Sequence, residues 1–317
     1  MNLLKHSLEG PTQEDHRTMT TYFQGYDYRG ATYSFLANYI WRTTYCLCWE
    51  IIDGYLCMAG ASCMLGDPAA VTSMPLTKDG TYDSARLRGV ILEEKRRFDE
   101  RKIPFAIVNV PGHMVPLLEE AFPGQLEITH DRDADEYVYE KEKLISLSGR
   151  ALHKKKNHMN FFLRTYQYQV RPITLDQKEE IMAFVDRLLA ERQDGPDEME
   201  SLRMEREAIF EALDLVDHSY VYAVAIYIDD KLQAFALGET LSSTLAVEHF
   251  EKANDQYRGL YQVICREFCS ALPEEIQYVN REEDMGLEGL RQAKEALKPD
   301  HMEERFHVCF KGTASGY

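Results

Sequence analysis

The stretch NREEDMG (280–286) places an amide, a guanidinium and three carboxylates directly after a short apolar run. The run, 276–280, is predicted to be a strand, and α/β proteins commonly build their sites where strands end. A carboxylate there can take a proton from an attacking amine or bind an ammonium group. The alternative is an acidic N-cap for a helix over 287–298, but capping needs one or two acids and no arginine. The candidate residues are Asn280, Arg281, Glu282, Glu283 and Asp284.

A second candidate lies in NDQYRGLY (254–261), at the expected junction between a strand and a helix. A helix N-terminus presents free backbone N–H groups and the positive end of the helix dipole, so it attracts anions. Gln256, Gly259 and Tyr261 have the spacing of a pyrophosphate-binding turn, although such a turn usually ends in a small residue. A tyrosine at that position would crowd an anion held by backbone amides. An ordinary turn before a helix is an equally good interpretation.

The third candidate is the basic run HKKKNHMN (153–160), in a chain whose net charge is −17. A helix over 152–165 would bury an apolar side and leave its cationic side chains elsewhere. A solvated helix face is the commoner explanation of such a run. The expected buried side is Leu152, Met159, Phe162, Leu163 and Tyr166. The candidates for binding a phosphate are His153, Lys154, Lys155, Lys156 and His158, followed by Arg164.

Composition excludes several classes of protein. With 53 acidic and 36 basic residues in 317, loose binding to nucleic acid or anionic membranes is disfavoured, and a polyanionic partner would need a local basic patch. The N-terminus lacks the apolar stretch of a signal peptide, and the longest uncharged run, 103–118, contains three prolines. We therefore expect a soluble, cytoplasmic protein. The seven cysteines have no paired CxxC spacing, so we expect reduced, buried thiols and no metal site.

Hydrophobic periodicity in the second half predicts strands and helices in a defined order. The expected strands are 166–173, three antiparallel strands within 221–253 that turn at 229–231 and 241–243, then 276–280 and 305–311. The expected helices are 174–192, 199–216, 259–272 and 287–298. This order of elements matches the GNAT acyltransferase fold, a mixed sheet splayed near its middle. In that fold the junction at 254–261 would hold the pyrophosphate of coenzyme A.

The first half predicts an abbreviated copy of the same fold. It contains an expected strand pair within 33–60 that turns at Asp53-Gly54, then a helix, a strand and a helix at 84–102, 104–110 and 113–122. A chain of this length suits two domains. We therefore predict an α/β chain with mixed sheets, built from two tandem GNAT-like domains. Their expected ranges are 1–148 and 149–317, the second opened by the basic helix at 152–165.

Three stretches together resemble a bacterial family: LSGRALHKKKNHMNFF, VEHFEKANDQYRGLYQVICREF and YVNREEDMGLEGLRQAKEALKPD. The segment YIWRTTY (39–45) is similar to the first-half signature of that family. It is the family of the C-terminal catalytic domain of phosphatidylglycerol lysyltransferases, which includes free-standing members of unknown function. The resemblance implies an active site between two GNAT-like domains. There an amino acid passes from aminoacyl-tRNA to the head group of phosphatidylglycerol.

The resemblance therefore implies a transferase that moves an activated acyl or aminoacyl group to an amine or hydroxyl of a small-molecule acceptor. The basic helix would meet the 3′ phosphates of the tRNA, and no stable membrane insertion is expected. Two alternatives stay open: a coenzyme A thioester as donor, and a non-catalytic protein that binds a small molecule. The implied catalytic residues are Glu248, Glu282 and Asp284. The implied substrate-binding residues are Asn280, Arg281, Glu283, Tyr257, Arg258, Gly259 and Tyr261.

Overall fold

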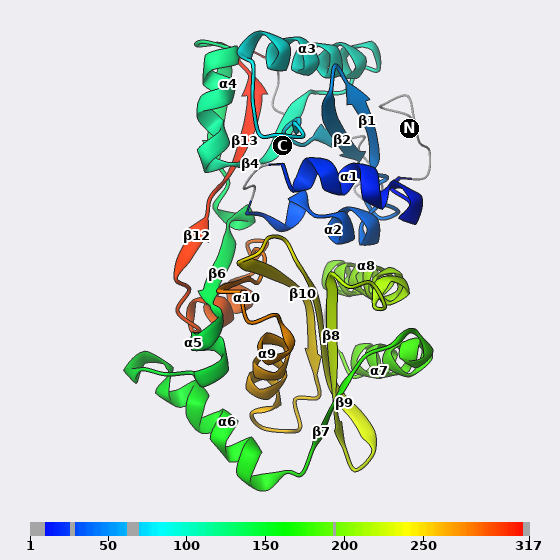
Figure 1. Ribbon diagram of the computed structural model, residues 1–317, viewed down its shortest axis with the longest axis vertical. Helices are drawn as coiled ribbons and strands as arrows, with labels where there is room; N and C mark the ends of the chain where they lie inside the picture. The colour runs from blue at the N-terminus through cyan, green and yellow to red at the C-terminus, as the bar shows by residue number, and fades with distance from the viewer. Residues whose placement is uncertain (1–9, 26–28, 62–69, 193–194, 313–317) are drawn as a thin grey trace. The chain divides into compact units, whose positions relative to one another are not determined.

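The computed structural model describes residues 10–25, 29–61, 70–192 and 195–312, and it divides the chain into two compact units. Unit 1 is Met1–Glu136 together with Glu303–Tyr317, and unit 2 is Tyr137–Met302. Each unit contains a mixed β-sheet and its own helices (Figure 1).

Unit 1 contains a six-stranded sheet in the order β1-β2-β3-β4-β13-β5. The pair β3–β4 is parallel and the other pairs are antiparallel. The strands are β1 (Cys48–Ile52), β2 (Tyr55–Ala61), β3 (Ala70–Thr72), β4 (Ala106–Pro111), β5 (Leu126–His130) and β13 (Arg305–Phe310). The α-helices are α1 (His16–Phe23), α2 (Phe35–Ile40), α3 (Ser84–Glu100) and α4 (Val115–Ala121).

The predicted turn between β1 and β2 is confirmed. Asp53 and Gly54 both have positive φ angles, 47° and 81°, as a two-residue hairpin turn requires. The earlier part of the expected strand pair is instead the helix α2. Its N-cap is Ser34, whose side chain accepts a hydrogen bond from the Ala37 amide and so starts the helix.

Unit 2 contains a seven-stranded sheet in the order β12-β6-β11-β10-β9-β8-β7. Its strands are β6 (Glu136–Glu140), β7 (Gln169–Pro172), β8 (Val221–Ile228), β9 (Lys231–Thr240), β10 (Leu245–Ala253), β11 (Tyr278–Asn280) and β12 (His301–Glu303). Its α-helices are α5 (Lys141–Ser146), α6 (His153–Thr165), α7 (Lys178–Ala190), α8 (Pro196–Ala212), α9 (Leu260–Ala271) and α10 (Glu288–Glu295).

Helix α9 lies on one face of the unit 2 sheet, and α7 and α8 lie on the other (Figure 1). The buried side chains of α9 recur at helical spacing, for example Leu260, Val263, Ile264 and Phe268. Helix α6 packs against α9, and its buried residue Phe162 belongs to the same core. The prediction of a helix at 152–165 is therefore confirmed, and this helix lies within unit 2.

The expected boundary at 148/149 differs from the division in the structure. Strand β6, which precedes that boundary, pairs with β11 of unit 2. Strand β13, near the C-terminus, lies between β4 and β5 of unit 1. The chain thus passes twice from one unit to the other, which sequence-local patterns do not reveal.

Five cysteines are buried and form no disulfide, as expected: Cys48, Cys57, Cys265, Cys269 and Cys309. Cys46 is disulfide-bonded, so the prediction of reduced thiols is wrong for that residue. Cys63 lies outside the described residues. Within the described part of the chain, no helix has both the length and the apolar character to cross a membrane.

Candidate functional site

The parallel strands β10 and β11 pair over three residues and then separate. Leu245, Ala246 and Val247 pair with Tyr278, Val279 and Asn280, and β11 ends there while β10 continues to Ala253. A bulge in β10, between Glu248 and Phe250, begins where this pairing stops. Bulges bend a strand and redirect its side chains. The candidate site therefore lies where β10 and β11 diverge, within unit 2.

Arg281, the first residue after β11, bridges this divergence. Its Nε donates to the Glu248 carboxylate, and its Nη2 donates to Glu251 Oε2 at 2.8 Å. The side chains of Glu248 and Arg281 are 2% and 15% exposed, so water screens the pair weakly. The structure thus brings together two of the predicted residues, Arg281 and Glu248, and adds Glu251.

Glu248 is the carboxyl group best suited to proton transfer. Burial raises its pKa to about 8, with Arg281 opposing the shift and Glu251 adding to it. Its Oε1 has no hydrogen-bond partner among the described residues. An unsatisfied buried acceptor costs about 1–3 kcal/mol. A base whose pKa lies near neutral pH and whose oxygen is unoccupied is matched to general acid–base chemistry.

His249 lies next to Glu248 and is not among the site residues predicted from the sequence. Its Nδ1 lies 2.7 Å from Glu282 Oε1, and its Nε2 lies 3.0 Å from Glu239 Oε1. Burial opposes the charged imidazolium, but the two carboxylates outweigh it and raise the pKa of His249 to about 10. His249 is therefore a buried cation, and one oxygen of Glu282 is committed to it. The sequence signal was the single His in the acidic stretch VEHFE.

Asp284 is surrounded by donors. Its carboxylate accepts from the Tyr137 hydroxyl at 2.5 Å, the Gly286 amide at 2.9 Å, and Arg291 Nε and Nη2 at 2.9 and 2.7 Å. Burial raises its pKa, but these hydrogen bonds outweigh that effect and hold it far below the usual range. A carboxylate of this kind is a weak base, so the geometry favours a positioning role for Asp284 over the expected proton transfer.

The rest of the 280–284 loop is held by main-chain contacts. Asn280, fully buried, accepts from the Glu282 amide at 2.8 Å. Lys294 Nζ donates to the carbonyl of Arg281 at 2.5 Å and also to that of Glu283. Glu283 is half-buried. The loop thus presents the Arg281 guanidinium to β10 from a fixed backbone.

The second candidate stretch has a packing function at Gly259. This residue has a φ of +95°, and a Cβ there would lie 2.1 Å from the carbonyl oxygen of His158 on α6. Gly259 therefore permits close packing of α6 against the start of α9, rather than presenting an open turn. Arg258 lies over the Phe161 ring at 5.1 Å, and Tyr257 packs edge-on against Tyr166. Tyr261 is 41% exposed.

One lysine of the basic run, Lys155, interacts electrostatically with residues of the candidate site. Burial lowers the pKa of Lys155, as does Arg281, whereas Glu251 raises it. His153 and Lys154 are exposed, while Lys156 and His158 are half-buried. Burial lowers the pKa of His158, and the cations Arg258, Lys154 and Lys155 lower it further. Lys155 is thus near enough for its charge to interact with Arg281 and Glu251.

Glu248, Glu251 and Cys265 could in principle ligate a metal, because their ligand atoms lie within 4.8 Å of one another. The guanidinium of Arg281, however, already bonds both carboxylates. The Cys265 thiol has its pKa raised well above the usual range by its hydrogen bond with Cys269 and by burial. A metal would need the Cys265 thiolate, and the raised pKa of the thiol disfavours that form.

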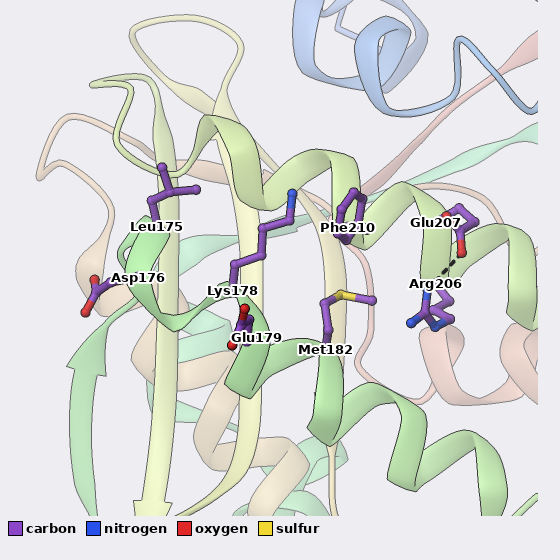
Figure 2. A pocket seen from close by; sticks show the side chains of 8 residues that line it. All are labelled: Leu175, Asp176, Lys178, Glu179, Met182, Arg206, Glu207 and Phe210. Carbon is purple, nitrogen blue, oxygen red and sulfur yellow. Dashed lines mark hydrogen bonds and ion pairs between the residues drawn. The ribbon is translucent and has the colours of Figure 1, made fainter.

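A separate hollow of about 750 Å³ opens between α7 and α8 (Figure 2). Its cations are engaged: Lys178 pairs with Asp214 at 2.6 Å, and Arg206 pairs with Asp186. Helices α7 and α8 lie on the face of the sheet opposite α9. The hollow contains none of the predicted site residues, and its lining is Leu175, Asp176, Lys178, Glu179, Met182, Arg206, Glu207 and Phe210.

Comparisons with known proteins agree with this fold. The family model described as phosphatidylglycerol lysyltransferase, C-terminal, matches residues 23–309. A crystal structure of a protein of unknown function from Bacteroides thetaiotaomicron has a TM-score of 0.84 and 29% identity, covering 96% of this chain and 100% of that one. The L-PGS of Bacillus licheniformis has a TM-score of 0.65 and 13% identity, covering 98% and 96%. The predicted mixed α/β fold with GNAT-like units is thereby confirmed.

An uncharacterized protein of Mycoplasmoides gallisepticum is 26% identical over 184 residues. The aligned region covers 58% of this chain and 58% of that relative. The chain therefore matches less than two thirds of the relative's length.

Proposed function

Because the chain belongs to the family of phosphatidylglycerol lysyltransferase C-terminal domains, we propose that it transfers an aminoacyl group from aminoacyl-tRNA to a small-molecule acceptor. The family and the fold are those of acyl and aminoacyl transferases. The observation that carries the proposal is Glu248: a buried carboxyl with a pKa of about 8 and an oxygen without a hydrogen-bond partner among the described residues.

In the proposed reaction, Glu248 accepts the proton of the acceptor nucleophile. The nucleophile attacks the ester carbonyl, and the bond to the tRNA 3′ oxygen breaks as the new bond forms. A proton then passes to the leaving oxygen. Arg281 holds Glu248 in place through its Nε and limits the rise in the pKa of Glu248 that burial causes.

The basic face of α6 is proposed to hold the phosphates near the 3′ end of the donor. Lys154 and His153 are exposed there, and Lys155 is near enough to Arg281 for the two charges to interact. In an acidic chain, such a local patch supplies the positive potential that a polyanion needs. An acyl-coenzyme A donor is less well supported, since α6 packs against Gly259 at the start of α9.

The test is transfer of a radiolabelled amino acid from a pool of charged tRNAs to acid-soluble products. Glu248→Gln should lower the rate at least 100-fold. The matched control Glu275→Gln, an exposed glutamate between α9 and β11, should leave it unchanged. The double variant Lys154→Ala, Lys156→Ala should weaken tRNA binding with a reduced salt dependence. Retention of full activity in Glu248→Gln would remove Glu248 from the reaction, and label moving from acyl-coenzyme A alone would replace the donor.

A further inference from the structure

A single guanidinium, that of Arg281, donates hydrogen bonds to both Glu248 and Glu251. Its Nε donates to Glu248, and its Nη2 donates to Glu251. Glu248 Oε1, inside the cluster, receives no hydrogen bond from any residue that the structure describes. A buried acceptor that lacks a donor in the free protein is a place where a ligand can supply one.

The charge of the cluster points to a cationic donor. Once Glu248 ionises, two carboxylates face the one positive charge of Arg281. Lys155 lies nearby, but burial and Arg281 lower its pKa and so disfavour its charged form. The titratable and charged groups around Glu248 are Arg281, Glu251, Cys265 and Tyr139.

The acceptors also lie close enough together for one ammonium group to reach all three. Oxygens of Glu248 and Glu251 and the sulfur of Cys265 lie within 4.8 Å of one another. Acceptors placed about 2.9 Å from one nitrogen along tetrahedral directions are about 4.7 Å apart. A neutral hydroxyl has one proton to donate, whereas an ammonium group has three.

We propose that Glu248, Glu251 and Cys265 form a site for a primary ammonium group, and that the acceptor of the transfer is therefore an amine. The second clause rests on the proposed function. The ammonium gives one proton to Glu248, and the free amine attacks the ester carbonyl. The C–N bond forms as the C–O bond breaks, and the second nitrogen proton passes to the leaving 3′ oxygen. Glu248 then releases its proton to water.

The binding test uses n-butylamine and n-butanol as matched probes in NMR titrations of the full chain. The amine should bind and the alcohol should not. Amine affinity should rise about tenfold per pH unit from pH 6 to pH 8 and level off above, because the Glu248 carboxylate ionises over that range. Glu251→Gln should weaken amine binding at least tenfold, and Glu275→Gln should leave it unchanged.

Three results would overturn the site: equal binding of amine and alcohol, amine binding that Glu251→Gln leaves intact, or displacement of the amine by micromolar Zn²⁺. A transfer assay separates this inference from the proposed function. Label that moves from aminoacyl-tRNA to hydroxyl acceptors but not to amines refutes the amine acceptor and leaves the transferase standing. Amine binding as described, with no transfer from any aminoacyl-tRNA, supports the ammonium site and counts against the transferase.

Discussion

Replacing His249 by Gln would remove the buried cation between Glu239 and Glu282. Both contacts are close, at 3.0 and 2.7 Å, and the side chains of His249 and Glu239 are 1% and 4% exposed. Gln can keep one hydrogen bond but carries no charge. Removing one member of a buried ionic set leaves an uncompensated carboxylate, which costs about 3–5 kcal/mol.

The pKa shift of His249 gives a second, independent value for its contribution to the free energy of unfolding. The pKa of His249 rises from 6.5 to about 10 on folding. A raised pKa stabilises the fold fully below the unfolded value, and this stabilisation is lost as the pH rises through the folded value. The contribution of His249 is therefore about 4 kcal/mol at pH 7 and falls below about 1 kcal/mol at pH 10.

Urea unfolding at pH 7, 8, 9 and 10 would measure this effect for the wild type, His249→Gln and the control His153→Gln, whose histidine is exposed. The gap between wild type and His249→Gln should shrink by about 3 kcal/mol across the series, because the wild type loses its imidazolium. The control should follow the wild type. A gap that stays constant with pH would show that His249 is neutral in the fold, and the ionic account of this cluster would be wrong.

Three further substitutions test other parts of the argument. Gly259→Ala should lower the unfolding free energy by more than about 2 kcal/mol, because Gly259 has a positive φ and lies against α6. The control Gly289→Ala, at a position in open space on α10, should raise the unfolding free energy by up to about 1 kcal/mol. A similar effect at both sites would contradict the packing role of Gly259. Asp284→Asn should lower the unfolding free energy by about 2–4 kcal/mol at pH 7. The difference from the wild type should disappear in acid, where the Asp284 carboxylate is protonated and its depressed pKa no longer stabilises the fold. Unchanged stability in urea unfolding at pH 7 would show that the four hydrogen bonds to Asp284 do not need its negative charge. Glu94→Gln should stabilise the protein by up to about 4 kcal/mol at pH 8 and have little effect at pH 4, because burial raises the pKa of this fully buried carboxyl to about 8. Melting temperatures that show no such trend with pH would mean that other groups offset the cost of the buried Glu94 charge.

Long periodic elements could be predicted from the sequence because their patterns are local. Helices α3, α7 and α9 carry buried residues at helical spacing, and the three strands β8–β10 are long, nearly continuous buried runs. The missed strands, β3, β5, β6 and β12, are three to five residues long, and β6 lies in an acidic tract. Strand β13 was predicted, but its partners are strands 170 or more residues earlier in the chain, so no local pattern could assign it to unit 1.

The candidate site shows the same division between local and distant information. Residue types at a strand end identified Arg281, and the family resemblance led to Glu248, but their hydrogen bond depends on how β10 and β11 diverge. His249 was missed because a bulge, which periodicity does not reveal, changes the register at that residue. Asp284 was predicted to transfer a proton because it is a carboxylate. The four donors that surround it are brought together only by folding, so the sequence did not indicate them.

The loop after β11 is fixed by contacts of several kinds, and this bears on how Glu248 can work. Asp284 forms an ion pair with Arg291, Glu282 contacts the His249 ring, and Lys294 donates hydrogen bonds to two main-chain carbonyls. Each contact fixes the backbone that carries Arg281, so the guanidinium need not reorganise when Glu248 gains or loses a proton. Most acidic side chains of the NREED motif are thus committed to structure, while Glu248, on the neighbouring strand, retains an oxygen that no described residue engages. Substitutions in the motif should therefore act on proton transfer indirectly, through the position of Arg281 and the pKa of Glu248.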